Sequence, residues 1–164
     1  MSTHTVRYRH VASPIGSLLL TSDGDALTGV HMEPHEIGDD WRRDDALLRP
    51  AAEQLRAFFA GDLREFDLAL AYTGTDFQRR VWTALRAIPY GETISYGEQA
   101  RRIGRPTAPR AVGAANGCNP IAIIIPCHRV IGADGSLTGF GGGLDRKRWL
   151  LSHEAAVLAR LKSA

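Results

Sequence analysis

The sequence Ile121-Ala-Ile-Ile-Ile-Pro-Cys-His-Arg-Val130 decides how the rest of the chain is interpreted. Its apolar, β-branched first half predicts a buried strand, which Pro126 ends because proline has no N–H to donate to a sheet. A thiol (Cys127), an imidazole (His128) and a guanidinium (Arg129) follow at once. Most free cysteines are small buried hydrophobes, but a cationic neighbourhood is what a reactive thiolate requires. Cys127 is therefore a candidate nucleophile.

The composition is that of a globular protein with a substantial core. The chain has 164 residues, of which 44% are hydrophobic, a length that suits one domain or two small ones. No stretch is long enough to span a membrane and the N-terminus lacks the features of a signal peptide, so the sequence predicts a cytoplasmic protein. Two cysteines, Cys118 and Cys127, form no disulfide framework, and no ligand spacing with His10, His31 or His35 supports a zinc site.

The net charge of +2 hides an asymmetry along the chain. Up to Thr75 there are seven Arg and no Lys against twelve Asp and Glu, a net charge of −5. From Asp76 onwards thirteen Lys and Arg face six acidic residues, a net charge of +7. This division indicates two segments with different partners, and the second is a candidate for binding a polyanion, unless it is only a solvated basic surface.

The first seventy residues predict a small α/β scaffold domain that begins with an antiparallel meander, because short apolar segments are separated by strong turn sequences. The strands are expected at Val6–Val11, Ser17–Ser22 and Ala26–Met32.

A polar, acidic loop is expected from His31 to Asp45. Apolar residues at helical spacing then predict a helix from Ala51 to Gly61, with Pro50 in its first turn. Phe66–Ala71 alternates weakly and is a candidate for a further strand. None of these residues forms a pattern with chemistry of its own, so the segment is interpreted as structural support.

The domain boundary is expected near Tyr72-Thr-Gly-Thr75, which gives an N-terminal domain of residues 1–72 and a C-terminal domain of residues 73–164. Thr75 and Gln78 have the spacing of a capping box. They predict the start of an amphipathic helix that ends before Pro89, where a turn sequence follows.

Two short helices joined by a tight turn come next, and they form a helix-turn-helix candidate. Ser95 and Glu98 have capping-box spacing at the start of the first helix, which Gly104 ends. Thr107 is expected to cap the second helix, which runs to Gly117. That second helix is rich in Ala and Gly, where a sequence-reading helix carries Arg, Asn or Gln. Such a smooth face suits an enzyme that scans DNA, although many helical pairs of this kind bind nothing.

Together with Asn119-Pro120 before it and Gly139-Phe140-Gly-Gly-Gly143 after it, the sequence Pro126-Cys127-His128-Arg129-Val130 resembles the acceptor site of the O6-alkylguanine-DNA alkyltransferases. The resemblance implies an α+β protein: a small N-terminal α/β domain with an antiparallel, RNase H-like sheet, then a mainly helical C-terminal domain with a winged helix-turn-helix.

The same resemblance implies DNA repair by a single-turnover reaction. The alkyl group of an O6-alkylguanine, flipped out of double-stranded DNA, passes to Cys127 and leaves an irreversible S-alkylcysteine. No cofactor and no metal is expected, and the protein is expected to act as a monomer. The sequence leaves open the size range of the alkyl group, activity on O4-alkylthymine and cooperativity along DNA.

The resemblance also implies the catalytic residues. Cys127 matches the acceptor, His128 a base that acts through one water, and Glu154 the residue that orients His128. Asn119 matches an asparagine that bridges the helix-turn-helix to the site. Glu154 lies on a helix expected at Leu144–Leu161, and its spacing alone favours a solvent-exposed carboxylate.

Further residues match the family's substrate and DNA contacts. Tyr96 matches a tyrosine that donates to the guanine ring, and Arg110 an arginine that fills the space left by the flipped base. Two departures from the family are Phe140, where tyrosine is common, and Cys118, where a small residue is more common. The remaining expected contacts are Val130 and Phe140 with the substrate, and Ala111 and Gly113 with the minor groove.

Three other classes of protein share part of this pattern. A Cys-His thiol hydrolase shares Cys127 and His128 but has no reason to carry a helix-turn-helix. A non-enzymatic module that only binds damaged bases lacks the acceptor cysteine that is present here. A fused adaptive regulator requires a cysteine cluster that is not found before the domain.

Overall fold

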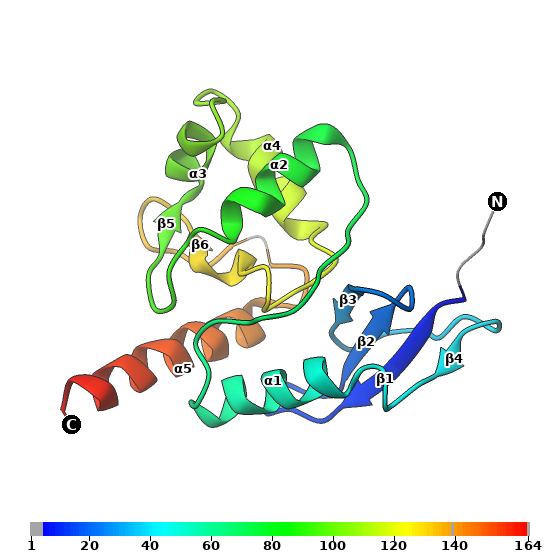
Figure 1. Cartoon of the computed structure of the whole chain (residues 1–164). Coiled ribbons are helices and arrows are strands. Elements are labelled where there is room, and N and C mark those ends of the chain that lie inside the picture. Colours follow the sequence, from blue (N-terminus) through cyan, green and yellow to red (C-terminus); the bar gives the residue numbers. More distant parts are fainter. Residues whose placement is uncertain (1–4, 139, 164) are drawn as a thin grey trace. The chain divides into compact units, whose positions relative to one another are not determined.

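The structure is a computed structural model that describes residues 5–138 and 140–163. The chain divides into two compact units (Figure 1). The first extends to Tyr72 and also includes Pro120–Ala122, whereas the second comprises Thr73–Asn119 and resumes at Ile123. A single boundary between residues 72 and 73, as expected from the sequence, does not account for Pro120–Ala122, which belong to the first unit. In the described part of the chain no helix is both long enough and apolar enough to cross a membrane.

The first unit contains a mixed sheet with the strand order β3-β2-β1-β4. The antiparallel meander expected from the turn sequences is present, and a short fourth strand pairs in parallel with β1 in the region expected to be a loop. Strand β2, between β1 and β3, is buried throughout. The strands are β1 (Arg7–Val11), β2 (Leu18–Ser22), β3 (Leu27–His31) and β4 (Arg42–Arg43).

One helix, α1 (Arg49–Ala60), completes the first unit. It ends at Gly61, whose φ of 82° is the left-handed conformation that glycine adopts without strain. The strand expected at Phe66–Ala71 was wrong, since only an isolated bridge joins this segment to β3. The physical reason is that the Gln54 side chain both donates to and accepts from the backbone of Asp67, which takes those groups out of a sheet ladder.

Apart from Ala122, the segment Ile121–Val130 is buried, but the strand expected before Pro126 was also wrong. Ile121 makes only an isolated bridge to Val30, and the N–H of Val30 donates to the carbonyl of Pro120. Ile123 then has a φ of 75°, a conformation that interrupts an extended chain and is rare for a β-branched residue. The buried segment is therefore irregular and connects the two units covalently.

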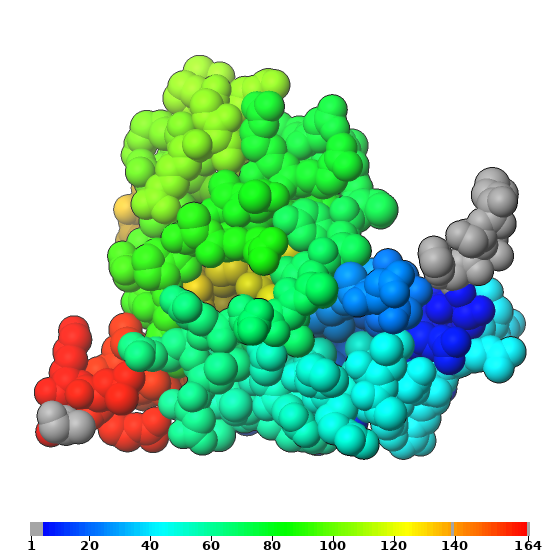
Figure 2. Space-filling model, in the orientation of Figure 1, coloured from blue at the N-terminus to red at the C-terminus, as the bar shows by residue number. Residues whose placement is uncertain are grey.

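The second unit is mainly helical, and its elements surround the segment that carries Cys127 (Figure 1). In the space-filling view, green atoms of α2 to α4 cover most of this face of the unit, and the yellow-to-gold part of the chain around η1 and β6 is visible mainly as a small patch (Figure 2). The elements are α2 (Asp76–Leu85), β5 (Ile94–Ser95), α3 (Tyr96–Arg102), α4 (Pro109–Gly117), the 3₁₀ turn η1 (Cys127–Arg129), β6 (Val130–Ile131) and α5 (Leu144–Lys162).

For α2, α3 and α4 the sequence predicted an N-cap residue, and two of the three predictions are confirmed. Thr75 and Gln78 form the complete capping box at α2, and the Ser95 hydroxyl accepts from the N–H of Glu98 at α3. The cap expected at Thr107 was wrong. Helix α4 begins after Ala108 with no side-chain cap, because Pro109 supplies the fixed φ that suits a first helical position.

Candidate active site

The turn η1 brings the three chemically distinct side chains of the acceptor sequence into the interior of the second unit. Cys127 is 7% exposed, His128 is fully buried and Arg129 is 6% exposed. The three residues form a 3₁₀ turn and not the end of an extended strand. Burial of an imidazole and a guanidinium requires partners, and both find one on α5.

That partner is Glu154, which is fully buried rather than exposed. Nε2 of His128 lies 2.7 Å from Oε2 of Glu154. The guanidinium of Arg129 donates to both carboxylate oxygens, with Nη2 to Oε2 at 2.9 Å and Nε to Oε1 at 2.9 Å. The backbone N–H of Gly91 donates to Oε1 at 3.0 Å. The carboxylate thus has the dense set of donors that a buried charge requires.

The protonation states of Glu154 and His128 follow from their burial and their hydrogen bonds. Burial by itself raises the pKa of Glu154, but the hydrogen bonds from His128 and Arg129 outweigh it and lower that pKa to about 2. Burial lowers the pKa of His128, against the opposing effect of Glu154. The resting pair is therefore a carboxylate and a neutral imidazole. We assign the imidazole proton to Nε2, beside the carboxylate, which leaves Nδ1 as the basic nitrogen.

Nδ1 of His128 is buried and has no hydrogen-bond partner among the described residues. A buried ring nitrogen without a partner is costly, so such an atom is a candidate for chemistry. His128 combines an oriented ring on one side with an available lone pair on the other, as a general base requires.

Opposing effects act on the pKa of the Cys127 thiol. Burial raises its pKa, while a hydrogen bond from the side chain of Asn119 and the positive charge of Lys147 lower it in part. Asn119 also donates from Nδ2 to the carbonyl of Ile125 at 2.7 Å, which fixes the amide beside the acceptor segment. A thiol with a raised pKa needs a base to become a nucleophile at neutral pH.

Lys147 is a residue of this site that sequence reasoning did not identify. Its side chain is fully buried, and its Nζ donates to the carbonyls of Val130 and Thr138 and lies 3.5 Å from the hydroxyl of Tyr96. Burial lowers the pKa of Lys147, and the charge of Cys127 raises it. The signal was present in the sequence, because Lys147 and Glu154 lie seven residues apart on the face of α5 that also buries Leu150.

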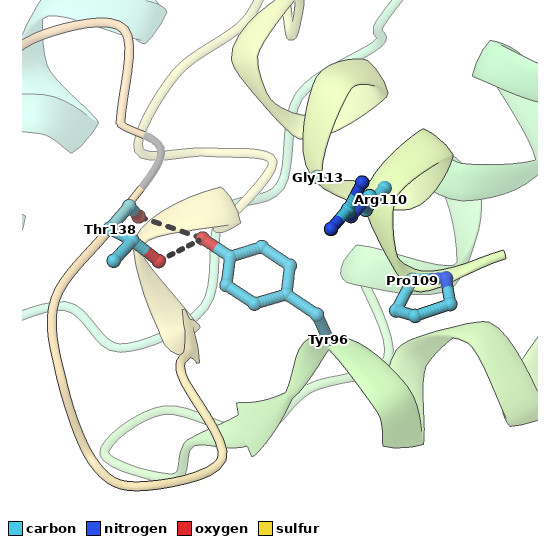
Figure 3. A pocket seen from close by; sticks show the side chains of 5 residues that line it. All are labelled: Tyr96, Pro109, Arg110, Gly113 and Thr138. Atoms are coloured by element: carbon cyan, nitrogen blue, oxygen red, sulfur yellow. Dashed lines mark hydrogen bonds between the residues drawn. The ribbon is translucent and has the colours of Figure 1, made fainter.

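A pocket of about 340 Å³ opens beside α3 and α4. Figure 3 shows the ring of Tyr96 between the loop that carries Thr138 and helix α4, with its hydroxyl directed at Thr138. This hydroxyl donates to the Thr138 carbonyl at 2.7 Å. The lining residues are Tyr96, Pro109, Arg110, Gly113 and Thr138. Three of them were expected from the sequence, whereas Pro109 and Thr138 were not, since neither has a distinctive side chain.

The other expected residues lie in different environments. Ala111 is exposed on α4, and Gly113 lines the pocket. Val130 is buried and contributes its carbonyl to Lys147. Phe140 is half-buried, and its carbonyl accepts from the N–H of Gly143. The expected glycine-rich loop includes residue 139, which lies outside the described residues.

Two family models match the two parts of the chain. The model described as "6-O-methylguanine DNA methyltransferase, ribonuclease-like domain" matches residues 6–72. The model described as "6-O-methylguanine DNA methyltransferase, DNA binding domain" matches residues 76–156. Together they account for the ribonuclease-like sheet and for the helical second part.

Individual proteins agree with this assignment along most of the chain. A methylated-DNA--protein-cysteine methyltransferase of Mycolicibacterium paratuberculosis is 56% identical, covering 91% of this chain and 92% of its own length. The one of Methanosarcina acetivorans is 52% identical, covering 91% and 98%. The crystal structure of Mycobacterium tuberculosis OGT in complex with DNA superposes with a TM-score of 0.88 at 56% identity, covering 92% of this chain and 94% of the other.

Proposed function

Since this chain belongs to the 6-O-methylguanine DNA methyltransferase family and repairs DNA by alkyl transfer to a cysteine, we propose that Cys127 is the acceptor and that the donor is an O6-alkylguanine in double-stranded DNA. The observation that carries the proposal is a buried thiol that is followed in the chain by an imidazole oriented by a buried carboxylate. Cytoplasmic action is part of the proposal, because a free thiol stays reduced in that compartment.

The proposed transfer is a single displacement. The Cys127 thiolate attacks the alkyl carbon, a carbon–sulfur bond forms and the bond from that carbon to guanine O6 breaks. The electron pair of the broken bond stays on guanine, which takes up a proton. The product is a thioether that water does not cleave, so each molecule reacts once. All side chains assigned to the reaction come from one unit of one chain, which fits a monomer as the reacting species.

The proton of the thiol is proposed to pass through one water to Nδ1 of His128. This nitrogen has no protein partner among the described residues, as such a water requires. Glu154, ionised at neutral pH, stabilises the imidazolium that forms. Lys147 contributes a positive charge that favours the thiolate over the thiol.

Tyr96 is proposed to donate to the guanine ring as negative charge develops on the leaving base. In the structure its hydroxyl donates to the carbonyl of Thr138, which also accepts from Lys147. A bound purine would compete for the phenol proton, and Lys147 would continue to satisfy the Thr138 carbonyl. This exchange leaves the Thr138 carbonyl with a donor. Asn119 donates to the carbonyl of Ile125 and is proposed to hold the helix-turn-helix in a fixed position relative to the segment that carries Cys127.

The alkyl carbon on O6 of a stacked guanine is inaccessible to a buried thiol, so we propose that the nucleotide is flipped, at a cost of roughly a few kcal/mol. Arg110 is exposed on α4 at the edge of the pocket and is proposed to fill the space that the base leaves. Ala111, exposed on the same helix, and Gly113 are proposed to allow close approach to the minor groove. Val130 and Phe140 are proposed to lie against the bound base.

The proposal is tested by incubating the protein with a duplex oligonucleotide that contains one O6-methylguanine. Peptide mass spectrometry is expected to find one added methyl group, on the peptide with Cys127, and repair is expected to stop at one methyl group per protein molecule. Absence of the adduct on Cys127 under conditions where the DNA is bound would contradict alkyl transfer. Repeated turnover without an adduct would instead favour the thiol hydrolase.

Replacement of Arg110 by alanine is expected to slow repair of duplex DNA about tenfold or more, because an unfilled space in the duplex lets the base return to the stack. Reaction with free O6-methylguanine base, which needs no flipping, is expected to change less than twofold. The matched control is Arg148→Ala, which removes the same charge from an exposed position on α5. Equal losses with duplex and free base would count against a role in flipping.

A further inference from the structure

The helix-turn-helix contains a fully buried polar pair to which the reaction assigns no role. Gln99 on α3 is 1% exposed and Asn116 on α4 is 3% exposed. Nε2 of Gln99 donates to Oδ1 of Asn116 at 2.9 Å, and Nδ2 of Asn116 donates to Oε1 of Gln99 at 2.8 Å. The two amides thus form a closed pair of hydrogen bonds, in a place where most helical pairs use only apolar contacts.

The pair lies one helical turn from the pocket on both helices. Gln99 follows Tyr96 by three residues on α3, and Asn116 follows Gly113 by three residues on α4, so each pair of residues shares a helix face. A Cβ added to Gly113 would lie 3.6 Å from Cδ1 and Cε1 of Tyr96. The spacing of α3 and α4 therefore decides the distance from the phenol ring to the floor of the pocket.

Helix α4 also has an anchor on α2, separate from its contacts with α3. Nε1 of the Trp82 side chain on α2 donates to the carbonyl of Ala115 at 2.8 Å, and this bond is buried. The remaining buried side chains between α3 and α4, such as Ala100 and Val112, are small and apolar. Such contacts tolerate sliding, whereas a buried amide whose partner moves away loses about 1–3 kcal/mol.

We propose that the Gln99–Asn116 pair fixes the width of the pocket between Tyr96 and Gly113 and thereby determines which alkyl groups the site accepts. The inference rests on the proposed function, because it concerns the substrate range of the same site. Gln99 and Asn116 act through Tyr96 and Gly113 and are positioning residues, since the pair is buried between the helices and does not line the pocket.

The test compares two duplexes that differ only in the alkyl group, O6-methylguanine and O6-butylguanine, at saturating DNA in single-turnover reactions. In the variant Gln99→Met/Asn116→Leu both amides are replaced by apolar groups of similar shape, which is expected to be nearly neutral for stability. The ratio of the butyl to the methyl rate is expected to rise at least fivefold, because the helices are no longer held at one spacing.

The exchanged variant Gln99→Asn/Asn116→Gln separates hydrogen bonding from volume, since it keeps two amides and the same number of methylene groups. Its ratio is expected to stay within twofold of the original protein. Thermal unfolding of each variant establishes that the fold is retained.

Three outcomes overturn the inference. One is a ratio for Gln99→Met/Asn116→Leu within twofold of the original, and another is the same change of ratio in both variants. The third is an original protein that transfers neither group, which would overturn the proposed function as well. An active original protein with unchanged ratios would contradict this inference alone.

Discussion

With Cys127 replaced by serine, we expect no detectable transfer of methyl groups from O6-methylguanine, while binding of the methylated duplex remains. A serine hydroxyl is similar in size and can accept the same bond from Asn119, but it does not ionise in the range that His128 can reach. The measurement is a pair of experiments on one preparation: loss of labelled methyl from the DNA, and the dissociation constant for the methylated duplex from a mobility-shift titration.

The control for this substitution is the other cysteine of the chain. Cys118 is exposed at the end of α4, and Cys118→Ser is expected to react at the original rate and with the original stoichiometry of one. Residual methylation of Cys127→Ser would contradict Cys127 as the acceptor. If that methylation disappeared in the double variant, Cys118 would be a second acceptor.

Replacement of Glu154 by glutamine is expected to slow transfer at least a hundredfold and to lower the free energy of unfolding by about 3–5 kcal/mol. The amide NH₂ of glutamine would face donors, because Arg129, His128 and the N–H of Gly91 all donate to this position. The charge of Arg129 would remain buried without its partner. Single-turnover rates and urea unfolding at pH 7 measure the two effects.

The same substitution is expected to change how the free energy of unfolding depends on pH. The pKa of Glu154 is lowered from 4.5 to about 2, which corresponds to roughly 3 kcal/mol. Since folding lowers this pKa, the stabilisation is complete above pH 4.5 and disappears as the pH falls towards 2. Urea unfolding between pH 7 and pH 3 is expected to show a smaller loss of stability for Glu154→Gln than for the original protein.

The matched control for Glu154 is Asp145→Asn, which removes a carboxylate from the same helix. Asp145 is fully exposed and pairs with Arg148 one turn away, so neither the rate of transfer nor the stability is expected to change measurably. A loss of activity and stability in Asp145→Asn as large as in Glu154→Gln would show that helix charge in general, rather than the buried contact, is responsible.

Much of the fold was predictable because local signals agree with the tertiary structure. Turn sequences between short apolar segments predicted the meander of β1 to β3, and the capping box at Thr75 predicted the start of α2. The segment Ile121–Val130 failed as a strand for a physical reason. A continuous apolar run indicates burial, but burial alone does not distinguish a strand from an irregular buried segment with a positive φ at Ile123.

The site was predictable only where chemistry is visible in a residue type. Cys127 and His128 were identified from an unusual neighbourhood, but Glu154 came from resemblance, since an isolated carboxylate on a helix is usually exposed. Its burial depends on Arg129 and on the N–H of Gly91, which lie 25 and 63 residues away in sequence. Lys147 was missed for the same reason, because lysine is rarely fully buried.

The parallel pairing of β5 with β6 has a consequence for the precision of the site. Ile94 pairs with Val130 and Ser95 with Ile131, so this ladder is only two residues long. Tyr96 follows directly after β5, and the turn that carries Cys127 ends directly before β6. A shift of one residue in this ladder would displace the phenol relative to the thiol by about 3.3 Å and reverse the faces of the side chains. The position of the Tyr96 phenol relative to the Cys127 thiol therefore depends on only two pairs of residues in this ladder.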